Sequence, residues 1–116
     1  MAGEKQYALN SDKIQPLAEG HGAAFATDLI TVQGNKIGYM YRDEPDNEYD
    51  SGWRFMAGTE TDDYMQDANN IDIYDVNTIA NYDPDIIPLL DSPFETAYER
   101  NEETGEFEEI EYEAME

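Results

Sequence analysis

The sequence contains no cysteine, a single histidine, and only six lysine and arginine residues among its 116 positions. Without cysteine the chain has no disulfide bond, no thiolate metal site and no cysteine nucleophile. The few basic residues exclude charge-driven binding to a nucleic acid and disfavour an anionic membrane surface. No apolar run reaches the ~20 residues of a membrane span or resembles a signal-peptide core. These absences predict a soluble, cytoplasmic, single-domain protein with no nucleic-acid or membrane partner.

Acidic residues are abundant instead. The chain has 28 aspartates and glutamates, a formal net charge of −22 and a pI near 4.1. Such charge is typical of disordered chains, but nine tyrosines, four phenylalanines and one tryptophan favour a folded core. Residues 1–42 hold four acids and four bases, so residues 43–116 carry the whole imbalance. This asymmetry indicates an interaction surface for a basic protein partner, or an acidic tail.

Hydrophobic patterning predicts an α+β fold, an antiparallel sheet with a few short helices packed on it. Residues 36–42 and 53–58 alternate as strands do, and the loop of about ten residues between them predicts that they pair antiparallel. Residues 23–27 form a small-residue run that fits a buried strand, and residues 94–100 alternate as well.

Three short helices are expected between these strands. Thr59 or Thr61 can cap the first, and Asp75 can cap the second. Pro84 suits the first position of a third, which Pro88 limits to about one turn. The predicted buried residues are Tyr64, Met65 and Ala68 in the first helix and Val76, Ile79 and Ala80 in the second.

The two ends of the chain are expected to differ from the middle. We predict an N-terminal arm at 1–20 with at most a short helix at 11–18, a single α+β domain at 21–112, and an acidic C-terminal end at 113–116. Residues 107–112 fit a hairpin partner for the preceding strand. They also fit a helix, because Phe107, Ile110 and Ala114 have helical spacing.

No residue pattern indicates catalysis or a cofactor. His21 lies between two glycines with no nucleophile motif around any serine, which favours a structural histidine over a catalytic one. With 28 acids, no particular carboxylate pair is informative. An EF-hand frame starting at Asp46 fails, because Ser51 and Ala57 stand where glycine and glutamate are needed, although weak Ca²⁺ affinity stays open. We therefore predict a non-enzymatic protein without a cofactor or a defined metal site.

The best candidate for a binding site is the acidic segment 43–50, whose composition predicts an ordered loop. It is followed by Trp53, the only tryptophan, and by Arg54. Tryptophan and arginine are frequent anchors of protein interfaces, but the pattern favours a buried tryptophan that begins a strand, beside an arginine paired with nearby acids, because buried tryptophan is commoner still. The two interpretations are compatible if the strand end forms the rim of a binding face. The predicted partner-binding residues are Arg42, Asp43, Glu44, Asp46, Glu48, Asp50, Trp53 and Arg54.

Three segments carry a family resemblance: GYMYR at 38–42, PD at 45–46 and DSGWRF at 50–55. With them the chain resembles, over about residues 20–107, a bacterial family of unknown function grouped with the immunity proteins of polymorphic toxin systems. The family pattern has a smaller, glycine-containing turn where this chain has Phe94 and Glu95. The resemblance implies an α+β domain without known catalytic residues that binds and blocks a cognate toxin. The alternative is a regulatory or housekeeping protein-interaction module whose acids only maintain solubility.

Overall fold

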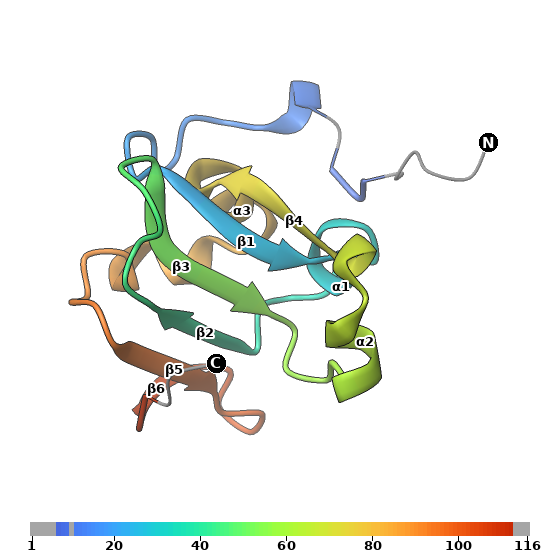
Figure 1. Ribbon diagram of the computed structural model, residues 1–116, viewed down its shortest axis with the longest axis vertical. Coiled ribbons are helices and arrows are strands. Elements are labelled where there is room, and N and C mark those ends of the chain that lie inside the picture. Colours follow the sequence, from blue (N-terminus) through green and yellow to red (C-terminus); the bar gives the residue numbers. More distant parts are fainter. Residues whose placement is uncertain (1–6, 10, 113–116) are drawn as a thin grey trace.

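A computed structural model describes residues 7–9 and 11–112. Six strands form one mixed sheet in the order β4-β1-β3-β2-β5-β6 (Figure 1). The strands are β1 (Ala23–Thr27), β2 (Tyr39–Arg42), β3 (Asp50–Met56), β4 (Ile71–Asp75), β5 (Thr96–Arg100) and β6 (Phe107–Ile110). The helices are α1 (Asp28–Thr31), α2 (Asp62–Gln66) and α3 (Val76–Tyr82), with 3-10 turns η1 (Ser11–Lys13), η2 (Ala68–Asn70) and η3 (Pro84–Leu89). The α+β class is confirmed.

The predicted ends of the chain fall only partly within this description. Residues 1–6 and 10 of the predicted arm and the predicted acidic end at 113–116 lie outside the described residues. In the described part of the arm, η1 is the only helical segment, and it spans three residues of the expected 11–18.

β3 has one antiparallel and one parallel neighbour. β2 and β3 pair antiparallel, from Tyr39 opposite Met56 to Arg42 opposite Trp53, which confirms the predicted pair. β1 pairs with the other side of β3 and runs parallel to it. The remaining pairings among the described strands are antiparallel, and β5 with β6 forms the predicted hairpin instead of the alternative helix.

The main core lies between one face of the sheet and α3 with η3, which lie behind the sheet in Figure 1. Trp53 and Phe55 of β3 point into it, and the Trp53 indole N–H donates to the carbonyl oxygen of Leu90 over 3.2 Å. The predicted helix cap is confirmed, since the Asp75 carboxylate accepts from the Asn77 N–H. The predicted inward residues Val76, Ile79 and Ala80 are fully buried. This packing fixes which face of β3 is turned away from the core.

The opposite face of the sheet has much less cover. Thr61 caps α2 as predicted, with its side chain accepting from the Tyr64 N–H. The prediction of a buried stripe on this helix is wrong: Tyr64 and Met65 are half-buried and Ala68 is exposed. The reason is that α2 has only five residues and lies beside the end of β3 instead of across the sheet (Figure 1).

β3 contains a bulge where it leaves the acidic loop. Ala23 lies opposite Asp50, but Phe25 lies opposite Arg54, so β3 has two more residues than β1 over this stretch. Gly52 occupies the bulge with φ of 89°, and a β-carbon there would lie 2.2 Å from the carbonyl oxygen of Asp43. The Asp43 N–H donates to the Gly52 carbonyl oxygen over 2.8 Å. Only glycine fits both the backbone conformation and this close approach.

The turn before β5 has a local conformational cost at Glu95. Glu95 has φ of 67°, in the left-handed region that favours glycine, and its N–H donates to the Arg42 carbonyl oxygen over 2.6 Å. A side chain in this conformation costs about 1 kcal/mol. The turn before β5 is thus held in a strained conformation by its hydrogen bond to β2.

Replacing Gly52 with alanine is expected to destabilise the fold by about 3 kcal/mol or more, because backbone strain and a clash with the Asp43 carbonyl act together. Gly105→Ala is the matched control, since Gly105 also has positive φ (77°) but open space around its β-carbon. The control should cost only about 1 kcal/mol. Urea denaturation measures both values, and equal losses would contradict the close approach at Gly52.

Candidate partner-binding site

The acidic loop is attached to the sheet by a bidentate ion pair. Arg54 Nη1 lies 2.9 Å from Asp50 Oδ1, and Arg54 Nη2 lies 2.9 Å from Asp50 Oδ2. In a regular strand, residues four apart are separated by about 13 Å. The bulge at Gly52 shortens this path, so that Asp50 can fold back onto Arg54. The pair therefore depends on the same glycine that admits the Asp43 carbonyl.

The Asp50 carboxylate also orders the backbone around it. It accepts from the N–H groups of Asp46 and Gly52, each over 2.9 Å. The hydrogen bond from Arg54, supported by these backbone donors, lowers the pKa of Asp50 to about 2. On its other side the Arg54 guanidinium lies over the Phe25 ring, 4.5 Å from the ring centre. Arg54 is thus held between the loop and β1.

Arg42 and Trp53 support the same region from within. The Arg42 guanidinium donates to the carbonyl oxygens of Ser51 (2.9 Å) and Ser92 (2.7 Å), and burial lowers its pKa. It also lies over the Phe94 ring, 4.6 Å from the ring centre. The Trp53 side chain has no exposed surface, so it belongs to the core. Both side chains connect the loop to the rest of the fold.

The acidic side chains of the loop divide into supporting and exposed ones. Asp43 is half-buried and accepts from the Tyr112 hydroxyl over 2.6 Å, which raises the pKa of Tyr112 to about 12. Asn47 accepts from the N–H of Tyr49 and of Asp50, which holds the tip of the loop. Glu44, Asp46 and Glu48 are exposed, and we call these three residues the acidic loop surface. Among the described residues, no group of three or more potential metal ligands is placed to hold an ion.

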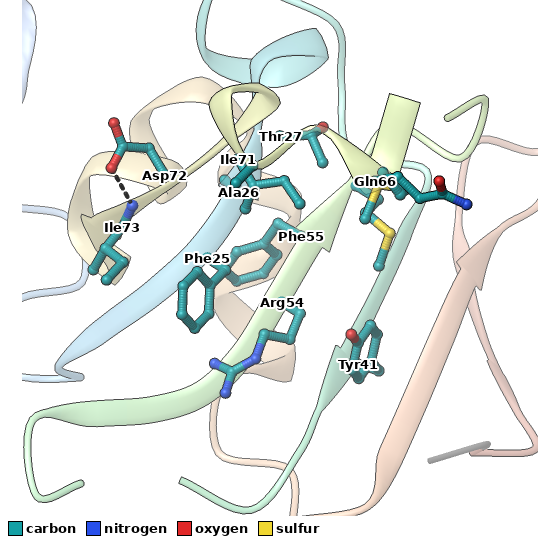
Figure 2. A pocket seen from close by; sticks show the side chains of 13 residues that line it. Phe25, Ala26, Thr27, Tyr41, Arg54, Phe55, Gln66, Ile71, Asp72 and Ile73 are labelled. Carbon is teal, nitrogen blue, oxygen red and sulfur yellow. Dashed lines mark hydrogen bonds between the residues drawn. The ribbon is translucent and has the colours of Figure 1, made fainter. Parts of the chain in front are cut away.

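The structure also places residues beside Arg54 that sequence reasoning missed. On the sheet face away from α3, a hollow of about 530 Å³ is lined by side chains of β1, β2, β3 and β4 and of the α2–η2 segment (Figure 2). Phe25, Ile71 and Ile73 contribute to it. The signal was present, because Ile71 and Ile73 alternate with Asp72 and Tyr74 as strand residues do. β4 is not predicted from the sequence, because this alternating run has only five residues and directly follows Asn69 and Asn70.

These observations define a small acidic α+β domain that presents an ordered acidic loop beside the sheet face with less cover among the described residues. The chain belongs to the family described as the Immunity protein Imm33 domain, which matches residues 24–111. The match confirms the resemblance carried by the segments at 38–42, 45–46 and 50–55. Searches of curated proteins and of solved structures gave no match. No helix within residues 7–9 and 11–112 is long and apolar enough to cross a membrane.

An NMR titration of the Asp50 side-chain carboxyl is expected to give a midpoint of about 2. Because this pKa lies below the ordinary value of 3.8, the ion pair stabilises the fold fully above about pH 4. The contribution disappears as the pH falls toward 2. In an Arg54→Met variant the midpoint should return toward the ordinary range.

Asp46→Asn is the control for this titration. The Asp46 carboxylate is 3.9 Å from Arg54 and its side chain is 77% exposed, so its loss should leave the Asp50 midpoint nearly unchanged. A wild-type midpoint near 3.8 would show that the pair does not form in solution.

Proposed function

We propose that this protein is a non-enzymatic immunity protein that binds a cognate toxin domain and blocks its activity. The observation that carries the proposal is the family match over residues 24–111, which runs from β1 to beyond the end of β6. The match therefore concerns the whole sheet and the acidic loop, and not an isolated motif.

The charge of the molecule supports a basic partner. The net charge is −22, and three of the six basic residues are used within the fold. Arg42 donates to backbone carbonyls, Arg54 pairs with Asp50, and Arg100 pairs with the buried Asp83. Of these three cations, Arg54 approaches the acidic loop surface, at 3.9 Å from the exposed Asp46, while its bidentate partner is Asp50. A cationic toxin domain would be attracted to the acidic loop surface, and the few basic residues of this chain would repel it only weakly.

The protein would block the toxin's activity if the toxin's basic residues line its substrate-binding groove. A toxin that acts on an anionic substrate, such as a nuclease, needs a basic groove to bind that substrate. Carboxylates held on an ordered loop can occupy such a groove and exclude the substrate. The Arg54–Asp50 pair contributes by fixing the loop before binding, which reduces the entropy lost in the complex.

The neighbouring genes give the first test: a toxin gene beside this protein's gene supports the proposal, and its absence favours a general interaction module. Co-expression with the toxin domain found in this way is the second test. We expect the protein to restore growth and to form a stable complex with the purified domain in size-exclusion chromatography. An absence of both protection and complex formation would contradict an immunity function.

Neutralising the acidic loop surface with Glu44→Gln, Asp46→Asn and Glu48→Gln together should slow association with the toxin domain about tenfold at low salt. The difference from the wild type should shrink as salt increases, because screening removes long-range attraction. Stopped-flow or surface-plasmon measurements over a salt series give both rates.

The matched control changes the same number of charges at the β5–β6 turn. Glu102, Glu103 and Glu106 are exposed there, and their joint replacement by glutamine should slow association by less than about threefold. If both triple variants slow association equally, overall charge and not the loop is responsible.

A further inference from the structure

The hollow of about 530 Å³ on the sheet face away from α3 is not explained by any of the interactions above. Its lining is mainly apolar, with Phe25, Tyr41, Met56, Met65 and Ile71 among its residues. Figure 2 shows the strands of the sheet that carry Phe25, Tyr41 and Ile71, and the Arg54 side chain lies on the same face of the sheet as the hollow. Arg54 is tied to Asp50, so its charge is already paired.

Exposed apolar side chains lie at and near the hollow. Ile73, which lines it, is 60% exposed, and Tyr49, which lines a smaller hollow together with Ile73, is 73% exposed. Contiguous exposed apolar surface of this kind marks interaction sites in soluble proteins. Within the described residues, α2 and η2 cover only one side of this hollow.

A second, smaller hollow connects this apolar surface to the acidic loop. It has a volume of about 240 Å³, and its lining includes Asp46, Tyr49 and Asp50. Phe25 and Ile73 border both hollows. The surface thus has an apolar centre and an acidic margin, the arrangement of interface hot spots with a polar rim.

We propose that the larger hollow is the docking site for an apolar side chain of the toxin domain, carried on a segment that also bears lysine or arginine. The apolar side chain lies between Phe25, Tyr41 and Ile71, and the neighbouring bases pair with Asp46 and Glu48. The inference rests on the proposed function and adds the surface and the chemistry of the partner segment. Charge complementarity selects this occupant, because a second copy of the chain would bring two net charges of −22 together.

The proposal assigns different rates to the two parts of the surface. The acidic loop surface acts at long range and therefore governs association. The hollow acts only after contact, when an apolar side chain leaves water, and therefore governs dissociation. Variants of the hollow should change dissociation with little effect on association.

Two variants test this with the toxin domain against which the wild-type protein protects in the co-expression test. Ile73→Thr removes exposed apolar surface while keeping a β-branched residue in β4. Ala68→Phe places a large side chain at an exposed position that lines the hollow, and it removes no core contact. Each variant should dissociate about tenfold faster, with an association rate within about twofold of the wild type.

Leu17→Thr is the control, because Leu17 is 45% exposed and its backbone N–H is bound to Asn77 on α3, across the sheet from the hollow. It should leave both rates unchanged. Wild-type dissociation rates for Ile73→Thr and Ala68→Phe, with slower association in the loop variant, would overturn the docking site and leave the proposed function intact. No complex with the wild-type protein would overturn the proposed function and the docking site with it.

Discussion

The arrangement of the candidate site depends on the ion pair between Arg54 and Asp50, which a bulge at Gly52 makes possible. A flat strand would place these two residues too far apart along the chain. With the bulge, one carboxylate binds Arg54 and also accepts from two backbone N–H groups, which orders the acidic loop. The motif at 50–55 is therefore a structural device, and its glycine, aspartate and arginine act together. Its contribution to function is to hold the loop that lies beside it.

Alternation along β3 then separates the two faces of the sheet. Trp53 and Phe55 face α3 and η3 and close the main core, whereas Arg54 faces the opposite side. The sheet thus has one face filled by the chain's own helices and one face with an exposed apolar hollow. Because the internal arginines are already paired, the exposed charge beside that hollow is acidic. The proposed interface for a cationic partner rests on this division.

Much of this could be predicted from sequence, since periodicity and caps are local signals. The pairing of β2 with β3, the strand at 23–27 and the helix capped by Asp75 were correct. The exposure of Ala68 could not be predicted, because it depends on where a short helix docks. Neither could the parallel pairing of β1 with β3 or the hollow, since both depend on strand order. Of the eight predicted site residues, only Glu44, Asp46 and Glu48 are exposed. The other five support the loop through contacts within the fold: Arg42, Asp43, Asp50, Trp53 and Arg54.

Hydrogen exchange on the complex with the toxin domain tests most directly the claim that the acidic loop and the adjacent sheet face bind the partner. Backbone amides of residues 43–50 and 61–70 should exchange more slowly in the complex than in the free protein. Those of residues 101–106, in the β5–β6 turn with its three exposed glutamates, should exchange at the same rate in both. Protection confined to residues 101–106, with none in the loop or beside the hollow, would contradict the account.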